Sequence, residues 1–223
     1  MHLQKGKKIL IYLFLFLIVG SINNIALTKI NFEKNNSIQI SGLNENQNIN
    51  LLENIKELNI KNIFFLNGKE ISKIISSNSL VENYEIFKKY PYVLDIKIER
   101  TKFLAKINNN GKTFLIGTNG KLSDVKFSDK ELPFIFGKPK VDEFIEFTNL
   151  IEQSKLPFNQ VKNLYFFQSK RWDLELKNNV ILKLSKDHTK LSLDQAFELI
   201  NDKNFKNIKV VDARIKNQII LND

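Results

Sequence analysis

The stretch "RWDLELKNNVILKLS", residues 171–185, predicts a β-hairpin, and with it a fold built on antiparallel strands. Apolar residues alternate with mostly charged ones on both sides of its centre: Trp172, Leu174 and Leu176 before it, Val180, Leu182 and Leu184 after it. This period of two is typical of strands with one buried face. Asn178 and Asn179 lie between the two sets, and asparagine tolerates the left-handed backbone of a two-residue turn. We expect Trp172 to anchor the core rather than to contact a partner.

A helix and a final strand are predicted after this hairpin. Ser192 and Gln195 have the spacing of a capping box, which predicts a helix that begins at Ser192. The stretch "IKVVDARIKNQIIL", residues 208–221, predicts a closing strand. We expect Ile215–Leu221 to be its open edge, because nothing after it is long enough to form another hairpin. In the alternative, Ile219 and Leu221 pack inward and Ile220 faces out.

The residues before the hairpin predict two folded parts. A short strand at "NSIQISGL", two helices with apolar positions at helical spacing, and two strands on either side of Pro91 form a compact α+β module. The loop "NNNGK", residues 108–112, marks its end. We therefore expect a βααββ domain over 37–107 and a mixed β domain with antiparallel strands and two helices over 108–223.

The N-terminus predicts export. Lys5, Lys7 and Lys8 precede an apolar run that begins at Ile9, and only Lys29 follows it closely. This asymmetry keeps residues 1–8 in the cytoplasm and places the chain after the run outside. We expect a membrane anchor over 9–28 and a linker over 29–36. A cleaved signal peptide is the alternative, since the strictly apolar part has the length of a signal-peptide core.

Composition argues for a binding protein rather than an enzyme or a nucleic-acid-binding protein. The net charge is +10, but nearly all of it is lysine spread along the chain, with arginine only at positions 100, 171 and 214. Base recognition relies on arginine more than on dispersed lysine. The chain has no cysteine and two histidines, of which His188 lacks further metal ligands nearby. We expect no catalytic residues, no metal, no cofactor and no small-molecule substrate.

The order of motifs resembles the FtsQ/DivIB family of bacterial cell division proteins. The segment "ISGL", two helices and "IFKKYPYVLDIKIER" are similar to the family's POTRA domain. The segments "LPFIFG", "RWDLELKNN" and "VVDARIKNQIIL" follow in the order of its β domain. The family tends to have an aspartate before one turn of this domain, where the chain has Gly117.

The resemblance implies a non-catalytic scaffold of the divisome at the septum. Such proteins cross the inner membrane once and recruit the coiled-coil proteins FtsB and FtsL, which add a strand to the terminal strand of the β domain; other division proteins are possible partners of the POTRA domain. Residues that match the family's partner-binding positions, or lie on the predicted edge, are Lys170, Arg171, Arg214, Ile215, Asn217, Ile219 and Leu221. The alternatives are a POTRA-containing secretion or outer-membrane assembly factor and a secreted periplasmic binding protein.

Overall fold

The computed structural model describes residues 3–22, 37–58, 68–90, 93–124, 131–202, 204 and 208–222. The chain divides into two compact units. One comprises Met1–Ser72 and Glu85–Lys97, and the other comprises Lys73–Tyr84 and Ile98–Asp223. The domain limits expected from the sequence, 37–107 and 108–223, stay a prediction.

The N-terminal helix α1 spans Leu3–Ile22 and contains the apolar run that begins at Ile9. No helix in the described part of the chain is both long enough and apolar enough to cross a membrane. The anchor over 9–28 stays a prediction, and its last residues, 23–28, lie outside the described part.

The order strand, helix, helix, strand, strand is confirmed. These elements are β1 (Ser37–Ser41), α3 (Glu45–Lys56), α4 (Gly68–Ser77), β2 (Val81–Lys89) and β3 (Val93–Arg100). The three strands form a sheet in the order β1-β3-β2. Strand β1 runs parallel to β3, with Ile38 opposite Leu94. Helix α3 buries Leu51 and Ile55, which lie four residues apart and therefore on one face.

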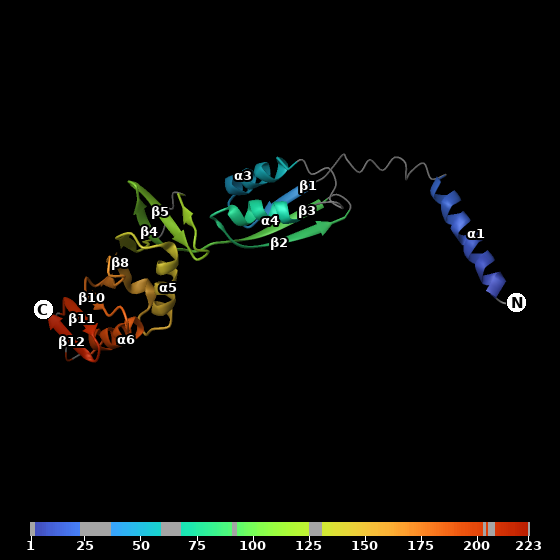
Figure 1. Ribbon diagram of the computed structural model, residues 1–223. Coiled ribbons are helices and arrows are strands. Elements are labelled where there is room, and N and C mark those ends of the chain that lie inside the picture. The colour runs from blue at the N-terminus through green and yellow to red at the C-terminus, as the bar shows by residue number, and fades with distance from the viewer. Residues whose placement is uncertain are drawn as a thin grey trace. The chain divides into compact units, whose positions relative to one another are not determined.

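A nine-stranded sheet dominates the second unit (Figure 1). Its strand order is β12-β11-β10-β9-β8-β7-β4-β5-β6. The strands are β4 (Phe103–Asn109), β5 (Lys112–Gly117), β6 (Leu122–Ser123), β7 (Phe134–Phe136), β8 (Val161–Phe166), β9 (Trp172–Leu176), β10 (Ile181–Leu184), β11 (Val210–Ile215) and β12 (Gln218–Asn222). Two helices, α5 (Val141–Glu152) and α6 (Thr189–Ile200), and the short 3-10 helix η1 (Phe158–Gln160) complete it. The predicted α+β class is confirmed. The "NNNGK" loop contains the turn between β4 and β5, two neighbouring strands of this sheet.

One row of apolar residues crosses seven strands of this sheet and forms the floor of the core. The row is Ile107, Ile135, Leu164, Leu174, Leu182, Val211 and Leu221, each opposite the next. Directly paired residues project from the same face of a sheet. Helices α5 and α6 cover this face with Phe144, Phe147, Leu193 and Ala196. Trp172 is 7% exposed and its ring stacks on Phe147 at 4.6 Å, so it is a core residue as expected.

The predicted hairpin at 171–185 is confirmed, but its turn has three residues instead of two. The Leu176 N–H donates to the Val180 carbonyl, and the Asn179 N–H donates to the Leu176 carbonyl, each at 2.9 Å. Residues 177–179 therefore form the loop. Only Asn179 of the two asparagines has a positive φ, 64°. A three-residue loop needs just one left-handed position, so Asn178 keeps an ordinary backbone.

The capping box predicted at Ser192 is wrong. Helix α6 begins at Thr189, one turn earlier, and Ser192 lies inside it and is buried. The Ser192 hydroxyl accepts a hydrogen bond from the Ser185 N–H and donates to the His188 carbonyl. It ties the connection after β10 to the helix instead of capping it.

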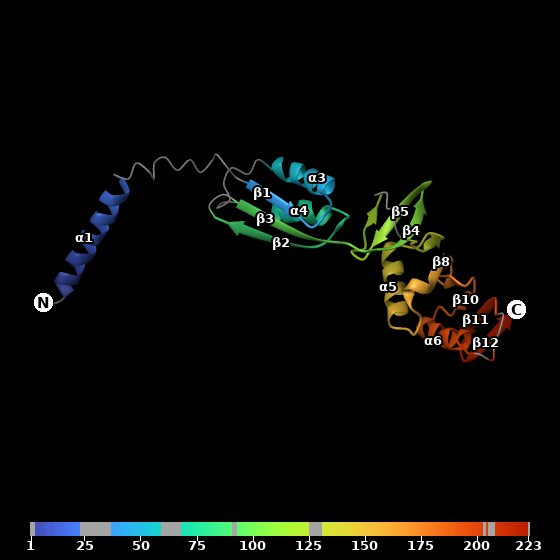
Figure 2. The same cartoon turned by 180° about the vertical axis from the view of Figure 1, so that it is seen from behind.

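The closing strand is a hairpin rather than one strand. Strand β11 ends at Ile215, residues 216 and 217 form the turn, and β12 returns antiparallel to β11. Asn217 takes a positive φ of 59° at this turn. Asparagine is common in turns, so Asn217 is a turn signal. The aliphatic residues on both sides of Asn217 nevertheless favoured the prediction of one continuous strand. Figures 1 and 2 show β11 and β12 beside α6.

Gly117 occupies a position with no room for a side chain. A Cβ there would lie 2.6 Å from the Thr101 hydroxyl and 2.7 Å from the Asn119 side-chain oxygen. Both neighbours are held by hydrogen bonds. The Thr101 hydroxyl donates to Glu82 at 2.7 Å, and the Asn119 amide donates to the Ser79 carbonyl at 3.0 Å. A side chain at position 117 would therefore displace this hydrogen-bonded network.

Candidate functional site

The strand register brings most of the predicted partner-binding residues to one end of the nine-stranded sheet. Lys183 on β10 lies opposite Asp173 on β9 and opposite Asp212 on β11. The start of β9 therefore lies beside the ends of β10 and β11. Five of the predicted residues belong to this end, on or next to these strand termini and the β11–β12 turn: Lys170, Arg171, Arg214, Ile215 and Asn217.

Arg214 folds back onto its own strand. Its Nε donates to both carboxylate oxygens of Asp212, at 2.8 and 3.0 Å, and its Nη2 donates to Oδ2 at 2.6 Å. The hydrogen bonds from Arg214 lower the pKa of Asp212, and the same pairing raises the pKa of Arg214. The Arg214 side chain remains 47% exposed, so a carboxylate from outside the chain has to compete with Asp212 for it.

Arg171 has a structural role in this end of the sheet. Its Nε and Nη2 donate to the two oxygens of Asp173, both at 3.1 Å, and its guanidinium lies 4.3 Å from the centre of the Phe167 ring. The Asp173 side chain is only 6% exposed, and one of its oxygens also accepts the Leu184 N–H. A buried carboxylate needs such partners, because burial without them is costly.

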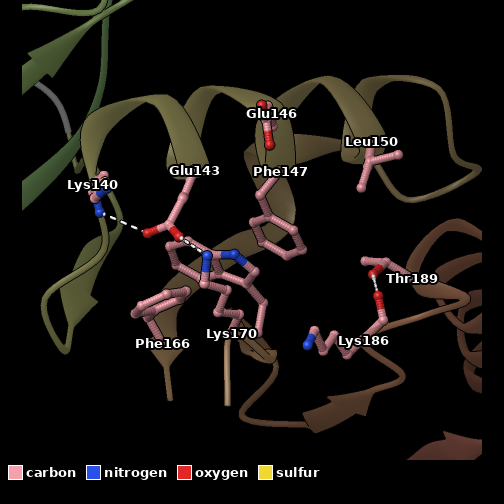
Figure 3. A pocket seen from close by; sticks show the side chains of 10 residues that line it. Lys140, Glu143, Glu146, Phe147, Leu150, Phe166, Lys170, Lys186 and Thr189 are labelled. Atoms are coloured by element: carbon pink, nitrogen blue, oxygen red, sulfur yellow. Dashed lines mark hydrogen bonds and ion pairs between the residues drawn. The ribbon is translucent and has the colours of Figure 1, made fainter. Parts of the chain in front are cut away.

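Lys170 lies in the β8–β9 turn with a φ of 64°, and its ammonium pairs with Glu143 on α5 at 3.2 Å. Glu143 also accepts the Lys140 N–H at 2.9 Å, and this bond is the main cause of its lowered pKa. The pair borders a pocket of about 470 Å³ between α5, the β8–β9 turn and the β10–α6 connection (Figure 3). The pocket was not foreseen from the sequence, because its lining comes from three separate stretches of chain.

Strand β12 is the edge strand of the described sheet and pairs only with β11. Ile219 and Leu221 are partly buried and pack against the core, while Ile220 is 50% exposed. The inward orientation of Ile219 and Leu221 was the alternative considered from the sequence, and it is correct. Ile215, at the end of β11, is 56% exposed. The two exposed isoleucines leave apolar surface beside the open edge.

The outer face of the same sheet carries a hydrogen-bonded carboxylate, Glu175. It accepts hydrogen bonds from the Asn163 amide at 2.8 Å, the Lys162 ammonium at 2.8 Å and the Tyr165 hydroxyl at 2.9 Å. These bonds, that of Asn163 foremost, lower the pKa of Glu175 from 4.5 to about 2. Burial and the bond to Glu175 raise the pKa of Tyr165.

The lowered pKa of Glu175 predicts an acid-dependent loss of stability. Since the folded state favours the charged form, this group stabilises the fold fully above about pH 4.5 and loses that contribution as the pH falls through about 2. We expect Glu175→Gln to be less stable than the wild type at pH 6, and the difference to shrink between pH 4.5 and 2. Urea unfolding of both proteins across this range measures it. Two curves that stay parallel down to pH 2 would contradict the assignment.

Among the described residues, no three acidic, histidine or cysteine side chains gather as metal ligands. The same part of the chain contains paired charges at one end of the sheet, an open strand edge and a pocket. Main-chain groups along such an edge provide affinity, and the side chains around it provide specificity.

Comparison with known proteins identifies a family. Residues 105–214 match the family described as cell division protein FtsQ/DivIB, C-terminal. A solved structure, the major extracytoplasmic domain of the trans isomer of the cell division protein DivIB from Geobacillus stearothermophilus, aligns with 48% of this chain and 98% of its own at 18% identity and a TM-score of 0.32. No curated protein matches. The matched residues run from β4 to Arg214 and leave β12 outside. On this match, residues 105–214 form a C-terminal domain of the FtsQ/DivIB family of cell division proteins.

Proposed function

We propose that this protein is a non-catalytic scaffold of the divisome that recruits FtsB and FtsL by strand addition to β12. The observation that carries the proposal is the position of β12 at the edge of the described sheet, beside exposed Ile215 and Ile220 and the half-exposed Arg214. An edge strand with unpaired N–H and C=O groups invites another strand. The division role of the family agrees with such a task.

The proposal includes the topology expected from the sequence. Residues 9–28 anchor the chain in the inner membrane, residues 1–8 lie in the cytoplasm, and 29–36 link the anchor to the exported part. A POTRA-like domain over 37–107 and a β domain over 108–223 then act at the septum. The lysines before the apolar run support this orientation.

Within this proposal, Arg214 tunes the partner interaction from the rim of the edge. Its exposed guanidinium is shared between Asp212 and a carboxylate of the partner, and rim charges of this kind affect association and register more than they affect the fold.

Reversing the charge of Arg214 tests this role. We expect Arg214→Glu to reduce capture of FtsB–FtsL by the full-length membrane-inserted protein about tenfold, because the introduced carboxylate would repel the partner carboxylate that pairs with Arg214. Lys209→Glu is the matched control, since Lys209 is exposed and precedes the opposite end of the same strand. Capture is measured by pull-down from detergent-solubilised membranes. Equal capture by both variants would remove Arg214 from the interface.

A further inference from the structure

The pocket beside Lys170 has an aromatic floor and a charged rim. Phe147 and Phe166 both contact Trp172: the centroid of the Trp172 ring lies 4.6 Å from that of Phe147 and 4.8 Å from that of Phe166. Leu150 continues this apolar surface along α5. The volume of about 470 Å³ lies within the roughly 300–1,000 Å³ that is usual for binding pockets. The floor therefore suits a bulky apolar side chain.

The rim offers a cation, Lys186, that no described residue neutralises. Lys170 is paired with Glu143, but Lys186 forms no ion pair or side-chain hydrogen bond with any described residue. Figure 3 shows the Lys186 side chain extending toward the pocket from the β10–α6 connection, across from Lys170. A carboxylate entering beside the apolar group would meet this ammonium. Three lysines and two carboxylates line the pocket: Lys140, Lys170, Lys186, Glu143 and Glu146. The net charge of this lining is therefore positive, which favours an acidic residue next to the apolar side chain.

The pocket lies at the end of the sheet where a strand added to β12 would begin or finish. Lys186 follows β10 by two residues, and the end of β10 lies opposite Ala213, next to Arg214 on β11. Lys170 and Trp172, which line the pocket, flank Arg171. Strands β11 and β10 lie between β12 and the pocket, so a partner chain that leaves the β12 edge at this end reaches the pocket by passing the ends of these two strands.

We propose that this pocket is a second anchoring site for the partner that adds to β12, and that it receives a large apolar side chain of the partner adjacent to an acidic residue that pairs with Lys186. This inference rests on the proposed function. It adds a side-chain anchor to a contact that otherwise consists of main-chain hydrogen bonds and rim charges. Buried apolar anchors commonly contribute most of the affinity of an interface.

The single tryptophan of the chain reports on this pocket directly. Full-length protein labelled with 5-fluorotryptophan gives one ¹⁹F resonance, from Trp172. We expect this resonance to shift when a soluble FtsB–FtsL complex is added, because the ring forms the floor that the anchor covers. Capture that proceeds without any shift overturns the pocket site and leaves the edge-strand proposal standing. Absence of capture by the wild type overturns both.

Substitutions that fill the pocket or reverse the charge at its rim provide a second test of the proposal. Leu150→Phe occupies the space of the anchor, and Lys186→Glu repels its acidic neighbour; we expect each to weaken capture about tenfold. Leu191→Phe is the control, since Leu191 is 39% exposed on α6 and does not line the pocket. Unchanged capture by Leu150→Phe and Lys186→Glu overturns the proposal. So does a ¹⁹F shift that depends on the protein's own concentration without partner, which indicates a second copy as occupant.

Discussion

Of the two substitutions Ile220→Pro and Leu221→Pro, one is expected to abolish capture of FtsB–FtsL while the protein stays folded, and the other is expected to destabilise the β domain. Neighbouring residues of a strand direct their N–H groups to opposite edges. In β12 one set of N–H groups bonds to β11, and the other faces the open edge. Proline removes one N–H and adds a ring in its place.

The expected effects are large because both edges depend on these groups. Loss of an outward N–H, together with the steric conflict of the proline ring, should weaken capture roughly a hundredfold, the equivalent of about 3 kcal/mol. Loss of an inward N–H should lower the free energy of unfolding by a similar amount. Pull-down and urea unfolding of the same two proteins separate the outcomes.

Residue parity supplies the control. Gln218→Pro should behave like Ile220→Pro, and Ile219→Pro like Leu221→Pro, since residues two apart share an orientation. The stabilities of Ile219→Pro and Leu221→Pro are compared with those of Ile219→Ala and Leu221→Ala, because these two side chains also pack against the core. Two stable neighbouring variants that both capture normally would exclude strand addition to β12. Truncation after Arg214 is a poorer test, because it also removes Ile219 and Leu221 from the core and leaves β11 as a new edge.

Arg171→Ala is expected to destabilise the β domain by about 3 kcal/mol, although Arg171 was predicted as a partner contact. Among the described residues, the Leu184 N–H is then the one remaining hydrogen-bond donor to the buried Asp173 carboxylate. An unpaired buried charge is costly, and the stacking on Phe167 is lost as well. If this variant captures less partner, loss of the folded β domain is therefore a sufficient explanation, and the result does not by itself show a contact between Arg171 and the partner.

Lys170→Ala is the matched control for this stability effect. Lys170 is the neighbouring cation, but its side chain is 67% exposed, and exposed ion pairs contribute about 0–1 kcal/mol. Chemical unfolding of both variants measures the difference. Asp173→Asn in the Arg171→Ala background should restore part of the stability by removing the charge. Equal stability of Arg171→Ala and the wild type would show that Asp173 does not depend on Arg171.

Local patterns in the sequence were sufficient for much of the fold. The alternation at Trp172–Leu176 predicted a strand, and the spacing of Phe144, Thr148 and Ile151 fits helix α5. Such periods depend only on which face of an element is buried. The Ser192 capping box failed because the same residue types also serve inside helices when a neighbouring loop supplies the partner, here the Ser185 N–H.

The predicted partner-binding site was also only partly determined by the sequence. The sequence by itself determined which residues carry charge near the last strands, and the motif order gave the family. Only the tertiary structure decided their partners: Arg214 with Asp212, Arg171 with buried Asp173, and Lys170 with Glu143 from a distant helix. Strand register and burial, which set these pairs, arise from contacts between segments far apart in the chain. The end of the chain shows the same limit. Its aliphatic residues predicted a strand, but contacts with the rest of the sheet divide this stretch into the hairpin β11–β12 and leave β12 as the open edge.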